Sequence, residues 1–327
     1  MTTDRIGLPA IYRARQRISG LVRRTDCVAS PDLSAIAGHP VSLKMEHRQA
    51  TGSFKLRGAS NAVASLSPEE RARGVVTAST GNHGRALAYA AKREGVAATI
   101  CMSELVPQNK LDEIGRLGAE IRIVGKSQDD AQVEVERLVS EKGMAMIPPF
   151  DAQAVIEGQG TLGLEIMEDE PETQCVVVPV SGGGLIAGVA SAVKGINPKA
   201  KIVGVSMERG PAMKASLDAG KPVLVREEAS LADSLGGGIG LDNQFTFPMC
   251  RALIDELILL SEDEIAAGIR HAYAVEREVL EGAGAVPIAA LLSGKLKLVG
   301  PSVFVLSGRN IDMAAHREIV GKAEAGA

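Results

Sequence analysis

The segment Gln49-Ala50-Thr51-Gly52-Ser53-Phe54-Lys55-Leu56-Arg57-Gly58-Ala59 says more about the architecture of this chain than any other. Its lysine follows a glycine, a hydroxyl residue and a phenylalanine, and opens a predicted helix that continues through Val63. We expect Ser53 to cap the first turn of that helix. The helix dipole and partial desolvation both disfavour an ammonium at Lys55. The pattern favours a neutral, nucleophilic amine; the alternative is a loop lysine beside a helix cap.

The bulk composition indicates a protein of about two domains with a large aliphatic core. The chain has 327 residues, enough for about two domains. Three Tyr, five Phe and no Trp leave the core to Ala, Val, Ile and Leu. The net charge is −4, and the absence of a basic run argues against a nucleic-acid partner.

The cysteines and the apolar pattern predict a cytoplasmic protein. Cys27, Cys101, Cys175 and Cys250 are too far apart in sequence for a metal knuckle or redox pair, so reduced core thiols are expected. The start of the chain has no apolar segment behind it, so no signal peptide is expected. No uninterrupted apolar stretch is long enough to span a bilayer, which argues against a membrane partner.

Strand-like and helix-like segments alternate along the chain. Short apolar strands between amphipathic helices predict parallel sheets covered by helices. Ser261-Glu262-Asp263-Glu264 is a capping-box pattern that begins a helix expected to reach Val279. The predicted strands are 75–78, 97–102, 120–124, 175–180, 201–206, 257–260 and 303–306, and the predicted helices are 82–93, 109–117, 129–142, 185–194 and 261–279.

A polar loop, Ser79-Thr80-Gly81-Asn82-His83-Gly84, joins a predicted strand to a predicted helix. Backbone N–H groups at a helix start lack intrahelical partners and bind anions readily. The loop therefore indicates an anion site. A plain helix cap with a solvated His83 is the alternative.

A glycine-rich turn, Ser181-Gly182-Gly183-Gly184-Leu185, also lies between a predicted strand and a helix. Glycine lets the backbone approach a phosphate closely, and the helix dipole favours the anion. Gly182, Gly184 and Ala187 also fit the G-x-G-x-x-A dinucleotide fingerprint, with Glu208 near the end of the next strand. The turn thus predicts a phosphate site of either kind, or a purely structural tight turn.

Two later loops complete the set of motifs. Ser307-Gly308-Arg309-Asn310-Ile311-Asp312 follows the last predicted strand, and Glu281-Gly282-Ala283-Gly284-Ala285 contains a glutamate before glycine. Taken alone, each could be structural, a strand-end turn in the first case and a helix end in the second.

Together these motifs closely resemble those of the serine/threonine dehydratase family of pyridoxal-phosphate enzymes, over nearly the whole chain. The resemblance implies that Lys55 carries the cofactor and that Phe54 packs on its ring. It further implies that Asn82 bonds the ring hydroxyl, that Glu281 faces the ring and that Ser307 bonds the pyridine nitrogen. Implied phosphate contacts come from Gly182, Gly183, Gly184 and Leu185, and implied substrate contacts from Ser79, Thr80, Gly81, His83 and Arg309.

The resemblance also implies a fold and an assembly. The expected architecture is the two-lobed, three-layer α/β/α fold of the tryptophan synthase β-like, fold-type II enzymes. A small substrate-loop domain at 74–149 is expected as an insertion into a large pyridoxal-phosphate domain formed by 1–73 and 150–327. A homodimer is expected because family members are usually dimers.

Three departures from the family pattern refine the expectation. Thr80 stands where serine racemases have the serine that acts as the second acid/base, which favours elimination over racemisation. Ser206 and Ala212 stand where metal-binding members have carboxylates, so no metal is expected there. Arg309 replaces the usual glycine, and the run that contains it resembles the hydroxyectoine-utilization dehydratases.

We therefore expect a pyridoxal-phosphate dehydratase, or ammonia-lyase, acting on a β-hydroxy α-amino acid. Threonine, serine and 3-hydroxyaspartate are candidate substrates, as is a hydroxy-diamino acid from hydroxyectoine breakdown. A hydroxyl at Ser307 cannot keep the ring nitrogen protonated as a carboxylate would, which favours elimination over aminotransfer. An amino-acid racemase, a nicotinamide-dependent oxidoreductase and a non-catalytic amino-acid sensor are the alternatives.

Overall fold

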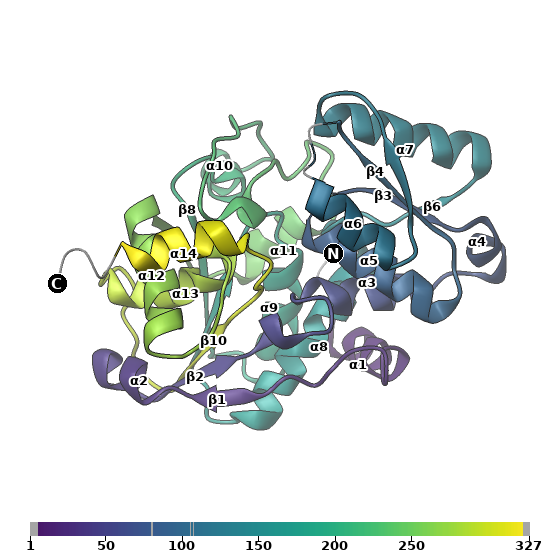
Figure 1. Cartoon of the computed structure of the whole chain (residues 1–327). Helices are drawn as coiled ribbons and strands as arrows, with labels where there is room; N and C mark the ends of the chain where they lie inside the picture. The colour runs from purple at the N-terminus through teal and green to yellow at the C-terminus, as the bar shows by residue number, and fades with distance from the viewer. Residues whose placement is uncertain (1–5, 80, 105, 107, 323–327) are drawn as a thin grey trace.

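Two separate sheets organise the protein, whose computed structural model describes residues 6–79, 81–104, 106 and 108–322. The larger sheet has the strand order β1-β2-β10-β7-β8-β9 and the smaller one β5-β4-β3-β6. All pairs are parallel except β1 with β2. Each sheet belongs to its own lobe, and the small lobe lies at the right of Figure 1.

The larger sheet is covered by helices on both faces. Its strands are rich in β-branched residues and buried from end to end at the centre, as in Cys175–Pro179. The strands are β1 Cys27–Ala29, β2 Val41–Lys44, β7 Cys175–Pro179, β8 Lys201–Met207, β9 Glu256–Leu260 and β10 Ser302–Val305. One face packs on α8 Gln153–Asp169, α9 Gly184–Ile196, α10 Ala212–Ala219 and α11 Thr246–Leu253. The other packs on α2 Pro31–Ala37, α12 Glu262–Ala274, α13 Gly282–Leu292 and α14 Met313–Gly321.

The smaller sheet has the same three-layer arrangement. Its strands are β3 Val75–Ala78, β4 Ala98–Met102, β5 Glu120–Ile123 and β6 Ala145–Met146. Helices α3 Lys55–Ala64, α5 Asn82–Glu94 and α6 Gln108–Arg116 cover one face, and α7 Gln128–Lys142 covers the other. Helix α3 contacts both α5 and α8, and so connects the lobes. The remaining elements are α1 Leu8–Arg17, α4 Pro68–Arg73 and the short turns Glu46–Arg48 and Asp233–Leu235.

The predicted fold class is confirmed. Each predicted strand is present within two residues of its expected bounds, and the core is aliphatic as expected. All strands of the smaller sheet lie inside the predicted insertion at 74–149, and all strands of the larger sheet lie outside it. The domain boundaries themselves stay a prediction. In the described part of the chain, no helix combines the length and the apolar character that a membrane span requires.

The prediction for α12 is right at its start and wrong at its end. Ser261 and Glu264 form the expected capping box. The helix stops at Ala274, five residues before the predicted Val279, because the chain turns at Arg277, which has φ +60°. The Glu278 N–H then bonds back to the Ala272 carbonyl at 2.8 Å. A helix that ends without glycine gives no strong stop signal in the sequence.

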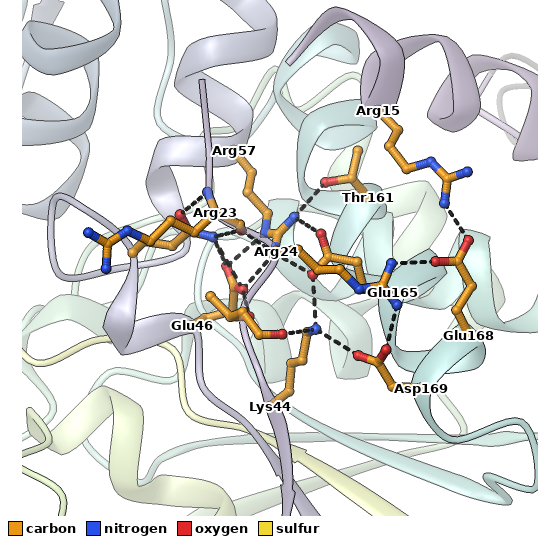
Figure 2. Close-up of polar contacts among 12 residues, drawn as sticks. Arg15, Arg23, Arg24, Lys44, Glu46, Arg57, Thr161, Glu165, Glu168 and Asp169 are labelled. Atoms are coloured by element: carbon orange, nitrogen blue, oxygen red, sulfur yellow. Dashed lines mark hydrogen bonds and ion pairs between the residues drawn. The ribbon is translucent and has the colours of Figure 1, made fainter. Parts of the chain in front are cut away.

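A buried cluster of charges fixes α3 against the larger lobe (Figure 2). Arg57 on α3 is fully buried and makes paired contacts of 2.7–2.8 Å with the carboxylates of Glu46 and Glu165. Lys44, also fully buried, contacts Glu165 at 2.9 Å and the Thr25 carbonyl at 2.6 Å. Burial alone would raise the pKa of Glu46, but Arg57 outweighs it and holds that pKa below its ordinary value.

The cluster continues to the surface with matched charges. Arg15 and Arg24 pair with Glu168, and Arg24 and Lys44 pair with Asp169. Four cations thus meet four carboxylates across β2, α1, α3, α8 and the segments beside them. Removing one buried partner leaves an uncompensated charge in a low-dielectric interior, which costs far more than losing an exposed pair.

We predict that Arg57→Met lowers the free energy of unfolding by about 3–5 kcal/mol, because Glu46 stays buried without its main partner. Urea unfolding of the cofactor-free protein measures this change. Arg137→Met is the matched control, since Arg137 is 41% exposed and pairs with Glu134 on α7. That change is expected to cost less than about 1 kcal/mol. Equal effects of the two substitutions would contradict the role given to Arg57.

Candidate active site

A cavity of about 450 Å³ lies between the two lobes, at the carboxyl ends of β3, β7 and β10. Ligand sites in parallel α/β sheets commonly lie at such ends, because loops and helix starts converge there. The predicted site residues that line this cavity are Phe54, Lys55, Ser79, Gly81, Asn82, His83, Gly182, Gly183, Gly184, Leu185, Glu281 and Ser307. Segments from nearly the whole length of the chain are thus brought together.

Lys55 lies at the wall of this cavity as the first residue of α3. Its Nζ donates to the Pro149 carbonyl at 2.7 Å and lies 5.4 Å from the centre of the Phe54 ring. Burial lowers the pKa of Lys55 to about 8, although the charge of Glu281 partly opposes this shift. About a tenth of the amine is therefore neutral, and hence nucleophilic, at pH 7, far more than for an ordinary lysine.

The expected cap of α3 by Ser53 is wrong. Phe54 is already helical, with φ −55° and ψ −24°, and the helix start has no side-chain cap. Instead, Ser53 pairs with Gly308 in an isolated antiparallel bridge, and the Phe54 N–H donates to the Ser307 carbonyl at 3.0 Å. Backbone pairing with the distant 307–308 turn, which local sequence does not reveal, therefore directs the chain at Lys55.

The glycine-rich turn before α9 has the properties of an anion site. Gly183 has φ +89°, and a Cβ there would lie 2.8 Å from Cys250 Sγ and Met213 Cε. A Cβ on Gly182 would overlap the ring of Phe150. Only glycine fits these positions, and the first-turn amides of the 13-residue helix α9 meet the cavity with no acidic residue among them. These features fit a cofactor phosphate.

The loop before α5 supplies a second set of polar groups. The Ser79 hydroxyl accepts from the Gly81 and Gly84 N–H groups at 3.4 and 3.2 Å. The His83 ring bonds the Ile147 carbonyl at 2.8 Å, so Nε2 carries the proton. Burial, followed by the charge of Lys55, lowers the pKa of His83 to about 3. His83 is therefore a neutral hydrogen-bonding group and not a cation.

Glu281 lies opposite this loop at the start of α13. Its Oε1 accepts from Asn82 Nδ2 at 2.8 Å, and its Oε2 accepts from the Asn310 N–H at 3.0 Å. Burial and then the charge of Asp233 raise the pKa of Glu281 to about 7, against the opposing hydrogen bonds. The buried Ser307 hydroxyl donates to the Ala283 carbonyl at 3.2 Å, next to the same helix start.

Two of the predicted substrate contacts, Thr80 and Arg309, are not among the described residues of the cavity lining. Thr80 lies outside the described residues, so the structure does not address its role. Arg309 is exposed and does not line the cavity; its N–H donates to the Gly52 carbonyl at 2.9 Å. In the 307–310 turn, therefore, Arg309 contacts the Lys55 segment through its backbone.

Sequence reasoning gave no role to several residues that shape the site. Phe150 packs against the glycine turn, Asn310 bonds Asn82, and Glu227 and Asp233 line the mouth of the cavity. These residues come from loops and carry no motif of their own. Only Asn310 had a signal, since it lies three positions after Ser307 in the polar run that follows the last strand.

The described residues contain no group of three or more His, Cys, Asp or Glu side chains arranged to hold a metal ion. At the positions where metal-binding members of the family have carboxylates, this chain has Ser206 in β8 and Ala212 at the start of α10. Neither side chain has a carboxylate. The four cysteines are free, and three of them are buried.

Comparison with known proteins identifies the family. The model of the pyridoxal-phosphate dependent enzyme family matches residues 18–308. A Sinorhizobium fredii protein with a provisional threonine dehydratase name is 64% identical over 96% of this chain and 95% of its own. The L-threonine ammonia-lyase of Thermotoga maritima is 42% identical over 97% of this chain and 79% of its own.

A solved structure supports the same assignment. The structure of maize serine racemase superposes with a TM-score of 0.91 and 32% identity, over 98% of each chain. The family match makes the dinucleotide interpretation of the Gly182–Gly184 turn unnecessary. This chain belongs to the pyridoxal-phosphate-dependent enzyme family and, within it, to the lyases of the threonine dehydratase type.

Proposed function

We propose that this lyase removes water from a β-hydroxy α-amino acid, and that the product then releases ammonia to give a keto acid. The observation that carries the proposal is the buried amine of Lys55 at the cavity wall, with its pKa lowered to about 8. An amine of that pKa exists partly as a free base at neutral pH, so it can both bind an aldehyde and accept a proton. The threonine ammonia-lyase relative supports this choice of reaction.

In this proposal, different parts of the cavity wall bind different groups of the cofactor and the substrate. The first-turn amides of α9 hold the cofactor phosphate, and the 79–83 loop receives the substrate carboxylate. When bound, pyridoxal phosphate supplies an electron sink for charge that develops at the substrate Cα. Lys55 Nζ takes the Cα proton. His83 stays neutral and keeps its Nε2–H on the Ile147 carbonyl, so its Nδ1 can accept a hydrogen bond from a substrate N–H or O–H without adding charge.

The residue beside the proposed ring-nitrogen position favours elimination. Ser307 offers a neutral hydroxyl, whereas a carboxylate there would hold the ring nitrogen protonated. A weaker electron sink favours rapid loss of the β-hydroxyl over reprotonation or aminotransfer. An amino-acid racemase is the second candidate, because of the similarity to maize serine racemase. A racemase would interconvert enantiomers without releasing ammonia.

The charges at the cavity mouth favour a substrate with a second amine. The lining contains the carboxylates of Glu227, Asp233 and Glu281, and Lys55 is its one lysine or arginine among the described residues. A further carboxylate, as in 3-hydroxyaspartate, would be repelled by Glu227 and Asp233, while an ammonium would be attracted. We therefore infer a hydroxy-diamino acid, which agrees with the hydroxyectoine-derived substrate expected from the sequence resemblance.

We further propose that the protein is cytoplasmic and forms a homodimer. The free cysteines support the cytoplasmic location.

Replacing Lys55 by Ala is predicted to abolish the visible absorption of the bound cofactor and to lower keto-acid release on the order of 10³-fold, because the base is lost. Lys142→Ala, at the exposed end of α7, is the control and should leave both unchanged. Spectra and a coupled keto-acid assay measure the two effects. A Lys55→Ala variant that keeps covalent cofactor and turnover refutes the proposal.

The rate at which pyridoxal phosphate attaches to the cofactor-free protein is predicted to rise with pH around a midpoint of about 8. The sign follows from the lowered pKa of Lys55, since the amine becomes neutral, and hence reactive, above that pH. Stopped-flow absorbance at a series of pH values measures the rate. A midpoint near the ordinary lysine value of 10.5 would show that Lys55 is not desolvated.

Among threonine, serine, 3-hydroxyaspartate and 3-hydroxy-2,4-diaminobutyrate, the diamino acid is predicted to have the highest kcat/KM and hydroxyaspartate the lowest. Glu227→Gln and Asp233→Asn should each raise KM for the diamino acid about two- to fivefold, as expected for exposed ion pairs. KM for threonine should stay constant. A preference for hydroxyaspartate, or equal effects on both substrates, would exclude this specificity.

A further inference from the structure

Asn310 contacts three parts of the site that are distant in sequence. Its side-chain Nδ2 lies 2.9 Å from the Thr51 carbonyl and 2.5 Å from Asn82 Oδ1. Its backbone N–H donates to Glu281 at 3.0 Å. Asn82 belongs to the small lobe, whereas Thr51, Glu281 and Asn310 belong to the large one. Asn310 is thus a polar contact between the lobes at the wall of the cavity.

The hydrogen bonds determine which way each amide points. The Thr51 carbonyl can only accept, so the Asn310 atom facing it must be the NH₂ group. The second N–H of that group then requires an acceptor, which places Oδ1 of Asn82 toward Asn310. The NH₂ group of Asn82 is consequently left on the other side, where it donates to Glu281 at 2.8 Å and to the Ser234 hydroxyl at 3.4 Å, both of which line the cavity.

Close packing prevents Asn310 from turning away. A Cβ on Gly52 would overlap Asn310 Oδ1, and Gly52 has φ +77°, a conformation suited to glycine. A Cβ on Gly308 would likewise overlap the Glu281 carboxylate. The 307–310 turn is held further by the Arg309 N–H, which donates to the Gly52 carbonyl at 2.9 Å. The amide of Asn310 therefore has one orientation, set by the backbone.

We propose that Asn310 is a positioning residue: its amide, aligned by the Thr51 carbonyl, orients the amide of Asn82 so that the NH₂ group of Asn82 faces Glu281, Ser234 and the cavity. The 3.4 Å contact with the Ser234 hydroxyl is the weaker of the two, so a negatively charged oxygen on the bound group can take its place. For pyridoxal phosphate, that oxygen is the ring oxygen assigned to Asn82. The inference rests on the proposed cofactor site and adds a residue that acts only through Asn82.

Asn310→Asp tests the orientation with little change in shape. The substitution puts an acceptor where the NH₂ group faced Thr51 and Asn82, so Asn82 is expected to turn its own NH₂ toward position 310. The cavity then loses a donor to the ring oxygen. We expect the ratio of long- to short-wavelength cofactor absorption of the holoenzyme to fall about two- to tenfold, the value of one hydrogen bond. The dissociation constant of pyridoxal phosphate should rise by a similar factor.

Three further variants make the test specific. Asn310→Ala removes the amide without adding charge and should produce a smaller fall in the absorption ratio. If Asn310→Asp does not fold, Asn310→Ala serves as the test variant. Asn82→Ala should lower the ratio by itself and abolish any further effect of Asn310→Asp. Asn197→Asp makes the same chemical change in the turn after α9, away from the cavity lining, and should leave the spectrum unchanged.

The outcomes separate this inference from the proposed function. If both Asn310 variants retain the wild-type absorption ratio and affinity, Asn310 does not orient Asn82. If Asn310→Asp lowers the absorption ratio by the same factor in the Asn82→Ala variant as in the wild type, its effect does not depend on Asn82. The inference is then also overturned. A wild-type protein without visible cofactor absorption would overturn the proposed cofactor site and this inference with it.

Discussion

The buried ion pairs of Arg57 with Glu46 and Glu165 are the constraint on which the rest of the structure depends (Figure 2). Arg57 lies two residues after Lys55, within the first turn of α3, so whatever fixes Arg57 also fixes the start of that helix. Buried charges tolerate few alternative arrangements, because each unpaired one costs several kcal/mol. The cluster thereby gives a flexible lysine side chain a rigid base at the wall of the cavity.

The site is assembled by backbone pairing between loops of the two lobes. The 307–310 turn pairs with the segment before Lys55, accepts from the Glu281 N–H, and through Asn310 reaches Asn82 in the small lobe. Donors and acceptors are oriented before a ligand arrives, so little reorganisation is needed on binding. The packing of the two lobes against each other therefore also affects the reactivity of Lys55. Desolvation by the surrounding loops is the main reason that the pKa of Lys55 is low.

The fold and much of the site could be predicted from sequence because their signals are local. Glycine turns and polar loops after apolar strands predicted the starts of α5 and α9 to within one residue. Where the prediction failed at the site, the cause was a long-range contact. Ser53, for example, does not cap α3 because it pairs with Gly308. The early end of α12 at Ala274 is a different case, because no glycine marks it and the left-handed residue that follows is Arg277. Residues such as Phe150 and Asn310 act through partners that only the tertiary structure brings near.

The most direct test of the account is to locate the covalent attachment of the cofactor. Holoenzyme would be reduced with borohydride, digested, and analysed by mass spectrometry, which identifies the lysine that carries the added pyridoxyl group. The account predicts a single modified residue, Lys55, within the segment that the Arg57 ion pairs hold in place. Modification at any other lysine, or no modification of protein purified with the cofactor present, would contradict it.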